Sequence, residues 1–197
     1  RDIFLRSLCV MAVMLFFTAT GARSGNMTLA VNALFMQLYL LYSHFMDGFA
    51  YAGEALVGKY AGAADKHSLR RCVSHLFAWG WSLAAIFAFA YGVFNHEVMS
   101  LFSDKPEVVA FAAAYRWWIA LAPIAGMAAF IWDGVFVGLT ATRQMLLSLA
   151  GATAVYFAIY FLSPFPDANS SLWTAFLTYL AVRGVILWLC FARKNEY

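Results

Sequence analysis

The chain has 197 residues, of which 64% are hydrophobic and only 12% are charged, and its formal net charge is +3. A soluble domain carries about 25% charged residues, so this composition excludes an ordinary soluble enzyme or binding domain. The small positive charge gives no indication of nucleic-acid binding. Three cysteines lie far apart in the sequence with no Cys-x-x-Cys pair, which predicts neither a disulfide framework nor a metal site.

Six apolar stretches are long enough to cross a bilayer, which takes about 20 residues of helix. They predict an all-α membrane protein whose single domain covers residues 1–197. The expected spans cover about residues 3–21, 28–57, 73–94, 119–140, 145–162 and 172–191. Residues 163–170, with two prolines, form the clearest turn.

Two of the expected helices are longer than one straight crossing needs. The stretch over about residues 28–57 must tilt or project past the membrane. Another helix is expected to begin at Pro106, with Ser103 or Asp104 as its cap. It should form an interfacial turn or two before the fourth span, and Pro123 is expected to bend that span.

Basic residues are distributed unevenly between the two sides of the predicted bundle. Six spans place both termini on one side, and nine of the thirteen lysines and arginines fall on that side. Two fall on the other side, and two lie in or near spans. Because basic loops stay in the cytoplasm, the sequence predicts that both termini are cytoplasmic. The nine are Arg1, Arg6, Lys59, Lys66, Arg70, Arg71, Arg143, Arg193 and Lys194.

Residues 47–62 combine acids with many small side chains. Asp47 and Glu54 are seven residues apart, which on a helix puts both on one face about two turns apart. Glycines and alanines around them would let another helix approach closely. The segment therefore predicts a packed helix that carries acids into the bilayer.

Four charged residues lie inside the expected spans: Asp47, Glu54, Asp133 and Arg183. Counted along each helix from its cytoplasmic end, they lie at depths of about 18, 8, 12 and 15 Å respectively. All four thus belong to the cytoplasmic half of the membrane. Charges in apolar helices face a bundle interior or a wet cavity, so these residues are candidates for ion coupling or transport.

Two interpretations of the acids remain open. In the first, they form a proton or cation relay whose protonation changes when a helix brings a cation nearer or moves it away. In the second, they pair with basic residues of the loops and hold the helix ends. The shallow position of Glu54 favours the structural interpretation, and the greater depth of Asp47 and Asp133 favours coupling. Arg183 needs a partner at its depth, and Asp133 fits that depth.

Motifs of membrane enzymes are absent from the sequence. It has no nucleophile elbow, phosphate-binding loop or His-Glu-x-x-His. We therefore expect a protein that is not an enzyme and that uses no cofactor.

Several short motifs in chain order resemble the second half of multidrug and toxic compound extrusion (MATE) transporters. The resemblance is strongest to the DNA-damage-inducible (DinF-like) branch and covers essentially the whole chain. The motifs are Arg-Asp-Ile-Phe-Leu-Arg at 1–6, Leu-Ala-Val-Asn-Ala at 29–33, Asp-Gly-Phe-Ala at 47–50 with Glu54, Leu-Phe-Ser-Asp at 101–104, and Asp-Gly-Val-Phe-Val-Gly-Leu-Thr-Ala-Thr-Arg at 133–143.

The resemblance implies a twelve-helix transporter made of two six-helix lobes, of which this chain is the C-terminal one. Such proteins export hydrophobic, often cationic, compounds by alternating access, driven by H⁺ or Na⁺. Asp133 matches an acid that helps bind the cation in sodium-coupled relatives. Those relatives also use a glutamate on the seventh span, whereas the first span here has no internal acid. This difference argues against a sodium site. The resemblance to the DinF-like branch implies proton coupling through an aspartate in the first span of the N-terminal lobe, outside this chain.

The expected function is therefore proton-coupled multidrug efflux across a bacterial inner membrane. The expected partners are the lipid bilayer, small hydrophobic or cationic substrates, and either an N-terminal lobe or a second copy of the chain. Two alternatives remain: a lipid-linked precursor flippase of the same superfamily, which needs a more basic cavity, and a membrane scaffold that transports nothing.

Overall fold

The computed structural model describes residues 2–163 and 167–194, and all regular secondary structure in these ranges is α-helical. Six helices there are long and apolar enough to cross a membrane, and the eight-residue α4 is too short. This confirms the predicted all-α fold with six spans. The helices are α1 (Asp2–Arg23), α2 (Asn26–Gly62), α3 (Lys66–Val93), α4 (Asn95–Phe102), α5 (Pro106–Gly138), α6 (Thr142–Leu162) and α7 (Ala168–Lys194).

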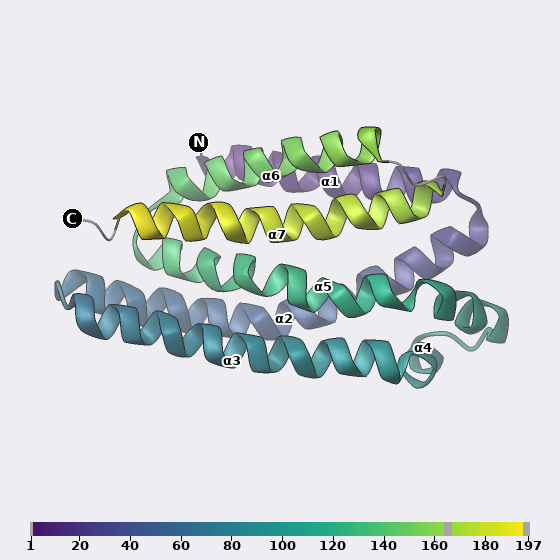
Figure 1. Ribbon diagram of the computed structural model, residues 1–197, viewed down its shortest axis with the longest axis horizontal. Helices are drawn as coiled ribbons and strands as arrows, with labels where there is room; N and C mark the ends of the chain where they lie inside the picture. The colour runs from purple at the N-terminus through teal and green to yellow at the C-terminus, as the bar shows by residue number, and fades with distance from the viewer. Residues whose placement is uncertain (1, 164–166, 195–197) are drawn as a thin grey trace.

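Helix α5 is the centre of the bundle. It lies between the α2–α3 pair and helix α7, beyond which α6 and α1 lie (Figure 1). Of its most apolar 18-residue window, 67% is buried, against 39% or less in the other spans. Helix α1 begins and α7 ends at the same end of the bundle, where the α2–α3 and α5–α6 connections also lie (Figure 1). The predicted even number of crossings accounts for this arrangement.

Helix α3 begins at Lys66, well before the apolar span expected from about Val73. The Asp65 carboxylate caps it by accepting a hydrogen bond from the backbone N–H of Ser68 at 2.9 Å. Hydrogen bonds from Ser68 also hold the pKa of Asp65 below its usual range. Capping thus extends the helix through polar residues that the hydrophobic pattern assigns to a loop.

The connection before α5 differs from the prediction in two respects. It contains the short helix α4, and neither Ser103 nor Asp104 caps α5. Lys105 is the N-cap residue without a side-chain hydrogen bond, and Ser103 has extended backbone angles at the end of α4. Pro106 does occupy the first turn of α5, as expected.

Helix α5 is one continuous helix that includes the residues expected to form an interfacial turn or two before the fourth span. It continues through Pro123, whose carbonyl accepts a hydrogen bond from the Tyr42 hydroxyl at 3.0 Å. Residues 164–166 of the predicted turn at 163–170 lie outside the described residues, between the end of α6 at Leu162 and the start of α7 at Ala168.

Close contact between α2 and α5 depends on two glycines one turn apart. A Cβ on Gly134 would overlap the backbone of Ala50, and a Cβ on Gly138 would lie 2.6 Å from the carbonyl oxygen of Glu54. No side chain larger than hydrogen fits at either position without moving a helix. The small residues expected to pack around residues 47–62 therefore do so against α5.

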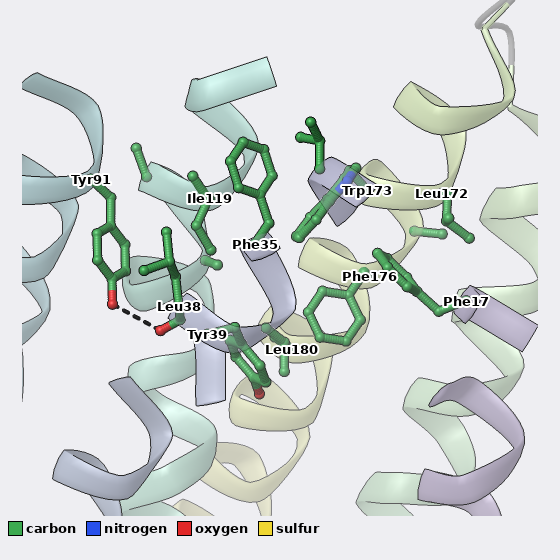
Figure 2. Close-up of a cluster of buried hydrophobic side chains, with 14 of the residues drawn as sticks. Phe17, Phe35, Leu38, Tyr39, Tyr91, Ile119, Leu172, Trp173, Phe176 and Leu180 are labelled. Carbon is green, nitrogen blue, oxygen red and sulfur yellow. Dashed lines mark hydrogen bonds between the residues drawn. The ribbon is translucent and has the colours of Figure 1, made fainter. Parts of the chain in front are cut away.

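The apolar core of one half of the bundle is rich in aromatic rings, as Figure 2 shows. Phe17 of α1 packs edge-on against Trp173 of α7, with ring centroids 5.1 Å apart. The Tyr91 hydroxyl of α3 donates a 2.8 Å hydrogen bond to the carbonyl of Leu38 in α2, the dashed line in Figure 2. These contacts join α1 to α7 and α2 to α3.

Candidate functional site

Two arginines from different helices converge on one carboxylate of the central helix. Asp133 of α5 is contacted by Arg6 of α1, with 2.6 Å between Nη2 and Oδ2, and by Nη2 of Arg183 of α7 on the same oxygen. The side chains of Arg6, Asp133 and Arg183 are 31%, 16% and 10% exposed. The most buried pair is therefore Asp133–Arg183, and Arg6 contacts it from the more open side.

These three residues line a cavity of about 260 Å³ that helix α2 also reaches. Asp47 contributes a second carboxylate to the cavity wall, and hydroxyls and aromatic rings form most of the rest. The other lining residues are Val10, Met14, Tyr39, Ser43, Ala50, Phe130 and Tyr179. Charged groups from four of the six candidate spans thus meet in one space.

The Asp47 carboxylate is half-buried, and among the described residues no ion pair or hydrogen bond engages it. Its negative charge, added to that of Asp133, balances the two arginines, so the formal charge of the cavity is zero when all four groups are ionised. Asp47 and Asp133 are the acids among the lining residues. These two carboxylates are the negatively charged groups that a bound cation would meet in the cavity. The described residues contain no group of three or more His, Cys, Asp or Glu side chains that could hold a metal ion.

Among the described residues, one oxygen of Asp133 has no hydrogen-bond partner. Oδ2 accepts from both arginines, whereas Oδ1 is buried and makes no hydrogen bond within the described part of the chain. An unsatisfied buried acceptor is costly. It therefore indicates a position where a proton, a water molecule or a cation would be stabilised.

Glycines next to the charged residues set this geometry. Gly134 follows Asp133 and lets α5 approach the backbone of α2, so that Asp133 and Asp47 line the same cavity. Gly184 follows Arg183, and a Cβ there would lie only 2.8 Å from the Cβ of Ala128 on α5. Both helices that flank Asp133 are thus held at short distance by glycine.

The structure brings together three of the four residues singled out from the sequence. The predicted pairing of Asp133 with Arg183 is confirmed, and Asp47 lines the same cavity. Glu54 does not join them: it is exposed and does not line the cavity, so the expectation that α2 buries both acids is wrong for Glu54. The physical reason is that α2 presents Gly53 and Val57, not Glu54, to its neighbours at this level.

Sequence reasoning missed Arg6, which it assigned to the cytoplasmic start of the first span. Arg6 lies in the second turn of α1, at the same end of the bundle as Asp133, and this register was the available signal. It also missed a buried polar group in the opposite half. There the Asn32 amide donates to Oδ1 of Asn169 at 2.7 Å and accepts from the Trp173 indole at 2.9 Å. A single asparagine in an apolar run does not reveal such partners.

Comparison with known proteins agrees with this architecture. Residues 3–162 match the MatE family. The chain is 33% identical to DNA damage-inducible protein F of Escherichia coli over 187 residues, which are 95% of the chain and 40% of that protein. It is 24% identical to Protein DETOXIFICATION 45, chloroplastic, and to Protein DETOXIFICATION 43, both of Arabidopsis thaliana, over 91% of the chain and about a third of each relative.

The chain therefore spans less than half the length of these relatives. The family match nevertheless covers most of its residues, and the closeness to the bacterial protein extends over nearly all of them. Six apolar helices and this match lead to one conclusion: the chain belongs to the MatE family of membrane transporters.

Proposed function

We propose that the chain forms the C-terminal six-helix lobe of a cation-coupled exporter that moves hydrophobic or cationic compounds out of the cell by alternating access. The observation that carries the proposal is the cavity in which Arg6, Asp47, Asp133 and Arg183 meet. Ionisable groups inside a membrane bundle are costly to keep. Four of them gathered from four helices suit a mechanism that moves charge.

The coupling step centres on Asp133. Loss of its negative charge, by binding a proton at Oδ1, would leave Arg6 and Arg183 without the carboxylate that they share. Repulsion between the two guanidinium groups would then favour movement of α1 and α7 relative to α5. The guanidinium group released from Asp133 would then pair with Asp47, which lines the same cavity as Tyr39 and Tyr179.

H⁺ fits this cavity better than Na⁺ as the coupling ion. A sodium ion needs several oxygen ligands, and the two carboxylates share the cavity with two arginines. The resemblance to sodium-coupled relatives would call for an acid on this span, whereas α1 contributes the cation Arg6 to the site. A proton needs one acceptor, and Oδ1 of Asp133 supplies it.

A second lobe, or a second copy of the chain, would complete the pathway. Helix α1 exposes Phe4, Met11 and Leu15, which are 66%, 57% and 66% accessible. The relatives are more than twice as long as the matched region. We place the protein in a bacterial inner membrane with both termini in the cytoplasm, since nine basic residues lie on that side and two on the other.

The two alternatives receive less support. A flippase for lipid-linked precursors would need a basic cavity for phosphate, whereas the charges here cancel. A scaffold without transport would not need an unpaired acid such as Asp47 in the cavity wall. A lipid-scrambling assay and a dye-efflux assay separate these alternatives from export.

The proposal is tested by dye efflux from cells that produce the complete transporter with Asp133→Asn in this lobe. We expect energy-dependent efflux to fall at least tenfold when variant and wild type are compared at equal amounts of protein in the membrane. The matched control is Asp104→Asn, the same chemical change at an exposed position, which should leave efflux intact. Unchanged efflux in Asp133→Asn at equal expression would sink the proposal.

A further inference from the structure

A groove on the outer side of α2 and α3 lies apart from the charged cavity. Its volume is about 510 Å³, and ten residues of the two helices line it. From α2 these are Phe49, Ala52, Leu56 and Tyr60, and from α3 they are Ser68, Arg71, Cys72, His75, Leu76 and Trp79. None of them lines the cavity around Asp133.

The polar and apolar residues that line the groove lie at different depths. Because α2 and α3 run antiparallel and side by side (Figure 1), Tyr60 and Arg71 lie near the α2–α3 connection, and Phe49 and Trp79 lie deeper. From Ser68 to Trp79 the groove extends about 16 Å along α3. Its mouth is polar and its inner wall is apolar, and this length is close to half of a bilayer's hydrocarbon thickness.

The mouth of the groove is positively charged. Arg71 is exposed, and no described acid pairs with its guanidinium group. The Lys59 ammonium lies 5.9 Å from the ring centroid of Tyr60 at the same end. The α2–α3 connection has one acid, Asp65, against the basic residues Lys59, Lys66, Arg70 and Arg71. The mouth therefore has a net positive charge.

We propose that this groove binds an acidic phospholipid of the cytoplasmic leaflet, with the phosphate at Arg71 and one acyl chain along Leu56, Leu76 and Trp79. A basic mouth above an apolar wall of acyl-chain length complements a phospholipid in both charge and shape. The assignment to the cytoplasmic leaflet rests on the orientation proposed above. Binding itself does not depend on the transport activity.

The first test measures lipid binding to the purified protein by native mass spectrometry. Phosphatidylglycerol and phosphatidylcholine of equal chain length are titrated separately. We expect tighter binding of phosphatidylglycerol, and Arg71→Gln should reduce that preference about fivefold, which corresponds to the roughly 1 kcal/mol contributed by one arginine near an anionic surface. Arg143→Gln is the matched control, because Arg143 is an exposed arginine of the same predicted side outside the groove.

The second test follows the acyl chain without changing any charge. Phosphatidylglycerol with brominated chains should quench tryptophan fluorescence more than brominated phosphatidylcholine, and Trp79→Phe should abolish that difference. Trp81→Phe is the control, since Trp81 is 50% exposed but does not line the groove. Equal binding of the two lipids, equal loss in both arginine variants, or a quenching difference that survives Trp79→Phe would each overturn the proposal. If phosphatidylglycerol is preferred in both the binding and the quenching experiments but dye efflux is absent, the proposed function is contradicted and the lipid site is not.

Discussion

Replacing Asp133 is expected to destabilise the protein more than replacing either arginine that contacts it. Asp133→Asn keeps the size of the side chain but leaves Arg6 and Arg183 in the cavity without their shared counter-ion. Arg183→Gln leaves Asp133 still paired with Arg6, and Arg6→Gln leaves it paired with Arg183. The three substitutions therefore remove different numbers of partners from one cluster.

Burial sets the magnitudes. Removing one member of a buried ion pair costs about 3–5 kcal/mol when the remaining charge is left alone, so we expect about 3 kcal/mol for Asp133→Asn. Arg183 is 10% exposed and its loss leaves one arginine on Asp133, so about 2 kcal/mol is expected. Arg6 is 31% exposed, and its loss should cost about 1 kcal/mol or less. Because the two residues act as a unit, the Asp133→Asn, Arg183→Gln double variant should lose about 1–2 kcal/mol less stability than the sum of the two single losses.

The assay is reversible unfolding of the purified protein by a denaturing detergent, with the unfolded fraction followed by tryptophan fluorescence. The free energy of unfolding is compared for the wild type, the three single variants and the double variant. If Asp133→Asn and Arg183→Gln are additive, the pairing does not contribute to stability in the membrane protein. An Arg6→Gln cost above that of Asp133→Asn would contradict the assigned order of burial.

Three further outcomes follow from the packing. Gly134→Ala should lower the free energy of unfolding by about 1–3 kcal/mol, because its Cβ would overlap a backbone carbonyl of α2. Gly48→Ala is the control and should be neutral or slightly stabilising, because Gly48 has open space around it. Equal effects in the same unfolding assay would argue against close contact of α2 and α5. Asn32→Ala should lower the free energy of unfolding by about 1–3 kcal/mol because it removes two buried hydrogen bonds. Gln37→Ala, at an exposed position, should change it little. Similar losses in the two variants would contradict the buried network. Glu54→Gln should keep dye efflux near the wild-type level because Glu54 lies outside the charged cavity; a loss as deep as that of Asp133→Asn would return Glu54 to the coupling site.

Much of the fold could be predicted because apolar length is a strong signal in membrane proteins. Six stretches of sufficient length predicted six spans, and the described residues contain six helices that are long and apolar enough to cross a membrane. Helix ends were harder to predict, since capping by Asp65 extends α3 through polar residues that no membrane pattern marks. Helix α4 was missed because eight residues carry too little periodicity to stand out.

Depth along the helices predicted the Asp133–Arg183 pair, because a charge in hydrocarbon needs a partner at its own level. Depth and spacing alone do not show which part of a helix its neighbours cover. Glu54 lies seven residues from Asp47, yet Asp47 lines the cavity and Glu54 is exposed, because Gly53 and Val57 are the α2 residues buried at the level of Glu54. The same limitation hid Arg6, whose approach to Asp133 depends on how α1 sits against α2, α6 and α7.

The most direct test of the central claim is substrate uptake into proteoliposomes under an imposed gradient of either H⁺ or Na⁺. The wild-type transporter should move dye when a pH gradient is applied, and a sodium gradient at constant pH should add little. Asp133→Asn should lose the response to the pH gradient while Asp104→Asn keeps it. Transport that follows the sodium gradient, or that responds equally to pH in Asp133→Asn, would contradict a proton-coupled cluster centred on Asp133.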